Sequence, residues 1–74
     1  MNSLSSKTSN LLKEIRKEKG KTLEGLSKRL KVGQLFLQKV EENDISITLD
    51  TLEKLLTALE IQQDEFLFRL SNKK

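Results

Sequence analysis

The chain has 74 residues, enough for one domain with a modest core, and it contains no cysteine and no histidine. Disulfides, thiolate metal sites and the imidazole bases of common hydrolases are therefore excluded, so the sequence predicts a protein that is not an enzyme and needs no metal or cofactor. Proline is absent and glycine occurs three times. Together with abundant leucine, lysine and glutamate, this favours an all-α fold.

The net charge of +3 hides an uneven distribution of charged residues along the chain. Residues 7–39 carry ten lysines or arginines against three glutamates, whereas residues 40–67 carry one lysine against eight acidic residues. The basic stretch is a candidate surface for a polyanion. Ordinary solvation of helix surfaces explains it equally well, because separation along the sequence is not separation in space.

Membrane and export signals are not evident in the sequence. No stretch approaches the roughly 20 apolar residues that span a bilayer, and residues 1–9 lack the apolar run of a signal peptide. We therefore expect a cytoplasmic protein without a membrane partner. The domain is predicted to cover residues 9–70, between a mobile N-terminal tail (residues 1–8) and a polar C-terminal tail (residues 71–74).

Five helices are predicted from the spacing of apolar residues and from capping residues. The first covers residues 9–19 and ends at Gly20, a helix stop. The second begins after Thr22, a good N-cap, and ends near Leu30. The residues of these two helices expected to face the core are Leu11, Leu12, Ile15, Leu23, Leu26, Ser27 and Leu30.

The third helix, residues 34–42, has two different sides when its residues are placed at intervals of 100°. Phe36, Leu37 and Val40 fall on the inner side. The opposite side carries Gln34, Leu35, Gln38, Lys39 and Glu42. Only residues 31–33 separate this helix from the second, and so short a link between two short amphipathic helices is typical of a helix-turn-helix.

The fourth and fifth helices complete the predicted fold. Thr48 caps the fourth, whose apolar face consists of Leu49, Leu52, Leu55, Leu56 and Leu59. The fifth covers residues 64–70, and its expected inward residues are Phe66, Leu67 and Leu70. Phe68 is expected on the opposite side, exposed to solvent.

Several short elements occur in a fixed order and spacing. They are Arg16, Gly20-Lys21-Thr22, Leu26-Ser27, Val32, Leu37 and Val40-Glu41, followed by Leu52, Leu55, Leu59, Ile61 and Asp64-Glu65-Phe66-Leu67. With this set, the sequence from Leu12 to Leu67 resembles the phage-repressor/Cro-like (XRE) helix-turn-helix family. Ile47-Thr48 and the closing residues 64–67 are most similar to the Rgg/MutR-like branch, which regulates genes in Gram-positive bacteria.

The resemblance implies a five-helix, lambda repressor-like domain that binds specific double-stranded DNA as a bacterial transcriptional regulator. Residues 34–42 would be the recognition helix in the major groove. Base contacts would come from Gln34, Leu35, Gln38 and Lys39, since Gln pairs with adenine, Lys reaches guanine and Leu contacts a thymine methyl. Phosphate contacts would come from Thr22, Lys28, Arg29, Lys31 and Asn43. Arg16 and Glu41 occupy positions that pair as a structural salt bridge.

The sequence also departs from the family pattern. Lys31 stands where glycine is common, so the turn either takes a strained left-handed conformation or differs in shape. Gly33 replaces the usual Ser or Thr cap of the third helix. Leu35 and Phe36 lie where polar residues are common. Glu42 stands where arginine is common and would repel nearby phosphates.

A second function class stays open, a protein-interaction module on the same fold that uses the Leu35/Phe36 surface and the acidic half of the chain. A homodimer is also predicted, through an exposed Phe68. Phe68 could instead pack against the first helix or contact another domain. Members of the Rgg/MutR-like branch usually carry a C-terminal peptide-binding domain, so a regulatory domain absent from this chain is a further expected partner.

Overall fold

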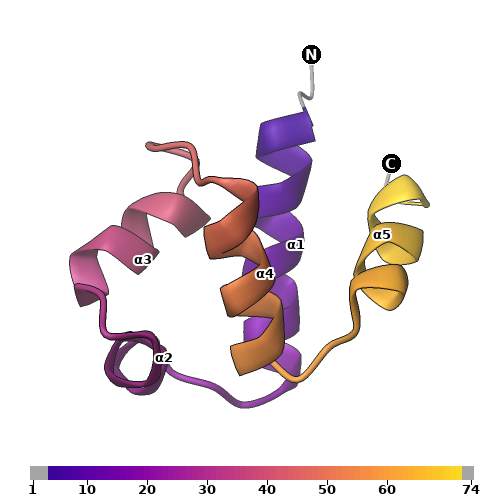
Figure 1. Ribbon diagram of the computed structural model, residues 1–74. Helices are drawn as coiled ribbons and strands as arrows, with labels where there is room; N and C mark the ends of the chain where they lie inside the picture. The colour runs from indigo at the N-terminus through magenta and orange to yellow at the C-terminus, as the bar shows by residue number, and fades with distance from the viewer. Residues whose placement is uncertain (1–3, 73–74) are drawn as a thin grey trace.

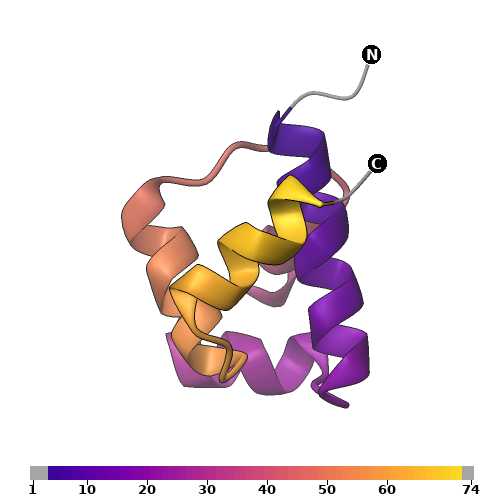
Figure 2. The same cartoon turned by 90° about the vertical axis from the view of Figure 1, so that its right-hand side faces the viewer.

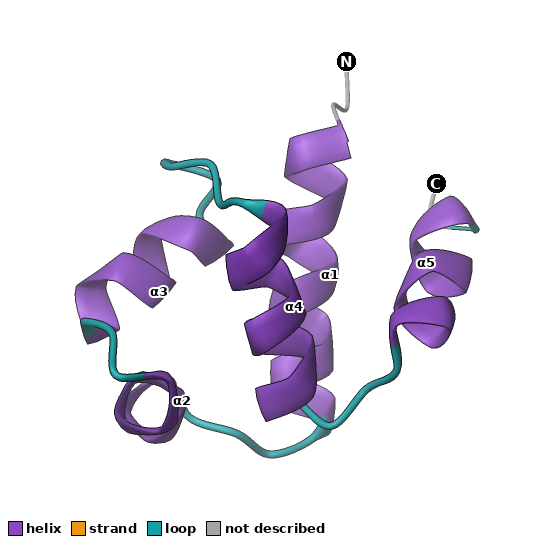
Figure 3. Ribbon diagram, in the orientation of Figure 1, coloured by secondary structure: helices purple, strands orange, loops and turns teal. Residues whose placement is uncertain are grey.

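The structure of the protein, a computed structural model, describes residues 4–72. All regular structure in these residues is helical (Figure 3), which confirms the predicted all-α class. The helices are α1 (Leu4–Glu18), α2 (Leu23–Leu30), α3 (Gln34–Glu41), α4 (Leu49–Ala58) and α5 (Gln63–Ser71).

The helices α1 and α4 form the centre of the molecule (Figure 1). In this view α2 and α3 lie on one side of them and α5 on the other. The view from the right-hand side shows α5 running across both central helices (Figure 2), and α5 contacts each of them. The surface of α3 that faces outward is therefore far from the surface that α5 presents.

One apolar core joins all five helices. The predicted inner residues of α1 and most of those of α3 and α4 are buried, as is Phe66 of α5, whereas Leu23, Leu30 and Phe36 are only partly buried. The fully buried side chains include Phe66, Leu11, Ile15, Leu59 and Val40.

Two leucines that we expected in the core lie outside it. Leu49 is 79% exposed and Leu67 is 60% exposed. Leu49 is the first residue of α4, and Leu67 lies about 100° around α5 from Phe66, at the edge of its buried stripe. The helical period correctly identified the apolar side of each helix. It does not show which residues on that side are covered by other helices.

The prediction of a mobile N-terminal tail was wrong for residues 4–8, which form the first turns of α1. They are tied to a distant part of the chain, because the Ser5 hydroxyl donates a hydrogen bond of 2.8 Å to Oδ1 of Asn43. At the other end, α5 extends through Ser71, and Nδ2 of Asn72 donates to the Phe68 carbonyl at 2.8 Å. The remaining tail residues, 1–3 and 73–74, lie outside the described part of the chain.

Each of the first four helices is followed by a residue with positive φ. Gly20 has a φ of 69°, Lys31 of 59°, and Asn43 and Glu60 of 60°. In each case the next residue donates its N–H to a carbonyl five residues earlier, as in Val32 to Ser27 at 3.1 Å. This bond satisfies a carbonyl at the helix end. Only Gly20 adopts the left-handed conformation without the cost of a side chain.

The two halves of opposite charge pair with each other in the folded chain. Among residues 4–72, three ion pairs join the basic stretch to the acidic one, namely Arg16 to Glu41, Lys21 to Glu60 and Arg29 to Glu60. A further pair connects the first helix to the last one. Arg69 of α5 donates two hydrogen bonds, of 3.0 and 2.7 Å, to the carboxylate of Glu18 in α1.

The Glu18–Arg69 pair predicts a pH-dependent contribution to stability. The hydrogen bonds from Arg69 hold the pKa of Glu18 below its ordinary value of 4.5, although desolvation opposes them. Because the folded pKa is depressed, the stabilisation is complete above pH 4.5 and is lost as the pH falls through the folded pKa. We expect Glu18→Gln to lower the urea midpoint at pH 7 and to have little effect at pH 2.5.

A matched control is Glu24→Gln, which removes an exposed pair with Lys28 within α2. This pair joins residues of one helix and should contribute less than a bidentate pair between two helices. A Glu18→Gln effect that is the same size at pH 7 and pH 2.5 would contradict the prediction.

Candidate nucleic-acid interface

The helix pair α2–α3 is built from local signals that the sequence carries. Oγ1 of Thr22 accepts a hydrogen bond of 3.0 Å from the Gly25 backbone and thereby caps α2. Lys31 ends this helix in the left-handed conformation, so the non-glycine residue does take the strained form. Gly33 then begins α3 without any side-chain cap. The α2–α3 unit is therefore short, tightly turned and weakly capped at its second helix.

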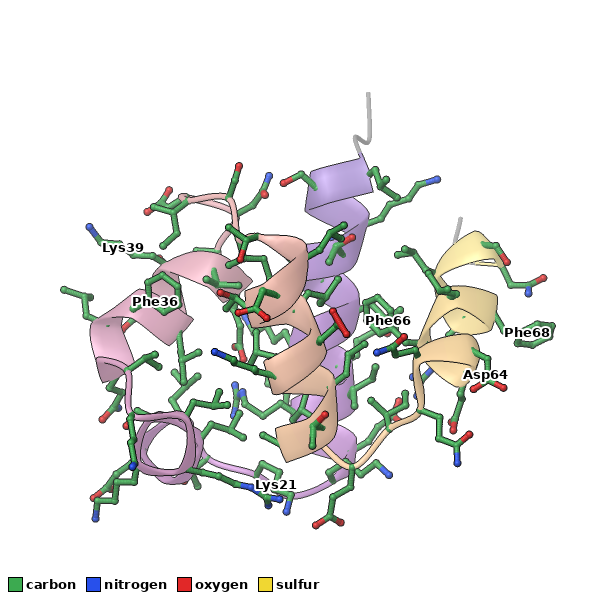
Figure 4. The ribbon with its side chains drawn as sticks, in the orientation of Figure 1. Lys21, Phe36, Lys39, Asp64, Phe66 and Phe68 are labelled. Carbon is green, nitrogen blue, oxygen red and sulfur yellow. The ribbon has the colours of Figure 1, made fainter. Side chains whose placement is uncertain are left out.

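The inner side of α3 fixes how the helix sits on the protein. Leu37 and Val40 are buried in the core, and Phe36 is half-buried and packed against it. The outward residues are those expected, Gln34, Leu35, Gln38, Lys39 and Glu42, and all are exposed. Figure 4 shows Lys39 extending away from the body of the protein. The structure thus gathers all four candidate base contacts on one exposed face.

Arg16 and Glu41 lie in contact and join α1 to α3. Nε and Nη2 of Arg16 donate to the two carboxylate oxygens of Glu41 at 2.6 and 3.1 Å. Both side chains are nearly buried, with 14% and 11% of their surface exposed. Nη1 of Arg16 also donates to the carbonyl of Lys21 at 3.0 Å, in the turn before α2. One guanidinium therefore connects α1, α3 and the start of α2.

The charged residues among the candidate phosphate contacts, and Lys39 among the candidate base contacts, differ in whether they form ion pairs. Lys31 and Lys39 take part in no ion pair within residues 4–72. Lys28 pairs with Glu24 at 3.3 Å but remains 77% exposed. Arg29 is directed instead toward Glu60, 3.9 Å away in the turn after α4. Lys39 on the exposed face of α3 and Lys31 in the turn before α3 are therefore cations without an ion pair among the described residues, whereas Arg29 is directed toward Glu60.

Two uncharged candidates keep hydrogen-bond donors available. The Thr22 oxygen accepts from Gly25, which leaves its own hydroxyl hydrogen to donate. Oδ1 of Asn43 accepts from the hydroxyls of Ser5 and Ser9, at 2.8 and 3.4 Å, which leaves the amide hydrogens of Asn43. Because phosphate oxygens only accept, both residues retain the chemistry that a phosphate contact requires.

The sequence reasoning missed an apolar groove on the surface of the molecule. It has a volume of about 370 Å³ and lies between the start of α1, residues 45–49 and α5. Three leucines with more than half of their surface exposed line it, Leu4, Leu49 and Leu67. We refer to these three residues and the hollow between them as the leucine groove. Phe68 is 69% exposed but is not part of its lining, and Figure 4 shows it pointing away from Phe66.

The described residues contain no cluster of acidic side chains that could hold a metal ion. None of the five helices combines the length and the apolar character that crossing a membrane requires.

The geometry agrees with what known proteins show. A family model described as helix-turn-helix matches residues 12–66. The chain belongs to this helix-turn-helix family, of the XRE type. Within the family, the second helix of the motif is the recognition helix, which here is α3. The likeness to the Rgg/MutR-like branch stays a prediction.

Solved structures of the restriction-modification controller protein C.Esp1396I are similar over nearly the whole chain. The wild-type protein is 31% identical, with a TM-score of 0.87 over 95% of this chain and 92% of that one. Its tetramer in complex with a natural 35 base-pair operator matches at 31% identity, a TM-score of 0.86 and the same coverage. A variant bound to its highest-affinity operator site OM matches at 33% identity, a TM-score of 0.85 and the same coverage. No curated protein matches the chain.

The position of the recognition helix predicts unequal effects of two adjacent glutamates. Glu41→Ala leaves the nearly buried guanidinium of Arg16 without its partner, which costs about 2–4 kcal/mol. Glu42→Ala removes an exposed side chain and should change stability by less than about 0.5 kcal/mol. Urea unfolding of both variants measures the difference. Equal losses would show that the pair does not hold α3 in place.

Proposed function

We propose that this chain is a transcriptional regulator that binds double-stranded DNA of defined sequence, with α3 in the major groove, and that it acts in the bacterial cytoplasm. The observation that carries the proposal is the exposed face of α3, which presents groups able to read bases beside two unpaired lysines. Solved relatives of this fold at more than 30% identity are bound to operator DNA, which supports the same use of α3 here.

The chemistry of the α3 face suits base reading. Gln34 and Gln38 offer amides that can accept and donate at once, as pairing with adenine requires. Lys39 can donate to guanine, and Leu35, with 61% of its surface exposed, can contact a thymine methyl. Lys31 at the preceding turn would hold the phosphate backbone, with Thr22, Asn43 and Lys28 as further donors, and Arg29 after release from Glu60.

The alternative function, a protein-interaction module, has less support. It needs a continuous apolar surface made by Leu35 and Phe36, but Phe36 packs against the core and leaves Leu35 as a single exposed leucine. Scattered single leucines are ordinary on protein surfaces. The two functions also differ in salt dependence, because phosphate contacts make affinity fall steeply with salt and apolar contacts do not.

A selection from randomised duplex DNA, read by sequencing, tests the proposed function. We expect one preferred site for the wild type. Gln38→Ala should remove the base preference at one position of the site and cost about 1–3 kcal/mol of binding free energy. Lys31→Ala should weaken binding to all sequences alike and reduce the slope of log affinity against log salt concentration by about 1. A folded wild-type protein that enriches no sequence would exclude specific DNA binding.

We further propose that the chain binds DNA as a homodimer through the leucine groove. A single helix-turn-helix unit covers one half-site, and paired units lie about 34 Å apart on the DNA. The leucine groove is suited to a two-fold contact, because exposed leucines and a hollow occur on the same face. Each copy of the chain can then place its leucines in the hollow of the other copy. This face is formed in part by α5, which lies on the opposite side of the molecule from α3 (Figure 1).

Sedimentation equilibrium distinguishes the leucine groove from Phe68 as the dimer contact. We expect Leu49→Ser and Leu67→Ser to weaken self-association at least tenfold, since each removes an apolar side chain from the interface. Phe68→Ser should leave association unchanged, as should the control Leu35→Ser on the α3 face. The reverse pattern would assign the contact to Phe68, and a wild-type monomer at high micromolar concentration would exclude both.

A further inference from the structure

A side-chain contact on the exposed face of α3 bears on which base Gln38 can read. Nε2 of Gln38 donates a hydrogen bond of 3.3 Å to a carboxylate oxygen of Glu42. The backbone N–H of Glu42 bonds to the Gln38 carbonyl, so the two side chains leave the helix one turn apart on the same side. Both side chains are exposed. Glu42 therefore lies beside Gln38 on the surface proposed to enter the major groove.

The charge of Glu42 determines how the Gln38 amide is turned. An ionised carboxylate only accepts hydrogen bonds, so the amide must present its NH2 group to Glu42. The flipped amide would place its oxygen against the carboxylate and lose the bond. The amide then has Oε1 and one remaining N–H free. Water exclusion in the groove strengthens this restriction, because charge interactions grow as the dielectric falls.

The free groups of the amide match one purine and not the other. Adenine presents N6–H2 as a donor and N7 as an acceptor, which complement Oε1 and the free N–H. Guanine presents two acceptors, O6 and N7. To bind both, Gln38 would need both amide hydrogens, and one of them is held by Glu42. The carboxylate itself also repels an acceptor edge.

From this geometry we infer that Glu42 is a positioning residue that makes Gln38 read adenine and reject guanine. The inference rests on the proposed function and adds a determinant of its specificity. It also explains why an acidic residue can remain at the end of a DNA-reading helix. Glu42 lowers affinity for every sequence by repelling phosphates, and it raises discrimination at one base pair.

The test is the randomised duplex selection carried out with three variants, after circular dichroism has shown that each is folded. Gln38→Ala first identifies the position that Gln38 reads. At that position we expect Glu42→Ala to reduce the adenine-over-guanine ratio about five- to tenfold, which is the usual net effect of losing one hydrogen bond. The same variant should bind more tightly overall. Glu42→Gln can donate as well as accept, so it permits both orientations of the Gln38 amide and should also lose most of the adenine preference.

Asp44→Ala is the matched control, since it removes one exposed negative charge two residues away that makes no side-chain contact with Gln38. It should raise overall affinity and leave the adenine preference unchanged. The inference is overturned if Glu42→Ala keeps the wild-type ratio, if Asp44→Ala lowers it equally, or if the wild type prefers guanine at the Gln38 position. In each of these cases the selection still enriches a preferred DNA site. If the proposed function fails, the selection enriches no site at all.

Discussion

The ion pair between Arg16 and Glu41 is the interaction on which the placement of α3 depends. An eight-residue helix with no side-chain cap has little stability alone, so its position must come from tertiary contacts. Leu37 and Val40 supply apolar burial, which is non-directional. The two parallel hydrogen bonds of the guanidinium supply direction, because the planar groups align only in one geometry. In a domain of this size, with a modest core, this pair thereby fixes the placement of a short helix.

The sequence predicted the α2–α3 unit well because its signals are local. Thr22 caps α2, the link is three residues long, and the 100° period separates the buried side of α3 from the exposed one. The same period could not show that Leu49 and Leu67 are uncovered, since this depends on where other helices stop. The start of α1 also depends on a hydrogen bond between Ser5 and Asn43, which are 38 residues apart.

The family resemblance implied the Arg16–Glu41 pair, but the other ionic contacts could not be predicted from the sequence, for a related reason. The separation of basic and acidic stretches suggested a charged face, but folding brings the two stretches together and neutralises part of the charge. The pair between Glu18 and Arg69 links positions 51 residues apart and has no local signature. What remains unpaired beside α3 is small, chiefly Lys31 and Lys39, with Glu42 nearby. A single copy therefore offers few phosphate contacts, which is consistent with a need for two copies on one DNA site.

The turn at Lys31 places two selective demands on one residue. Its φ of 59° is a conformation in which a side chain costs about 1 kcal/mol relative to glycine, yet the same side chain carries a free ammonium next to α3. In the proposed DNA complex, stability and DNA contact therefore respond to this position in opposite directions. Directed evolution for heat resistance alone would favour glycine here. The resulting domain would be more stable but would bind the proposed DNA site with lower affinity, a trade-off common at functional positions.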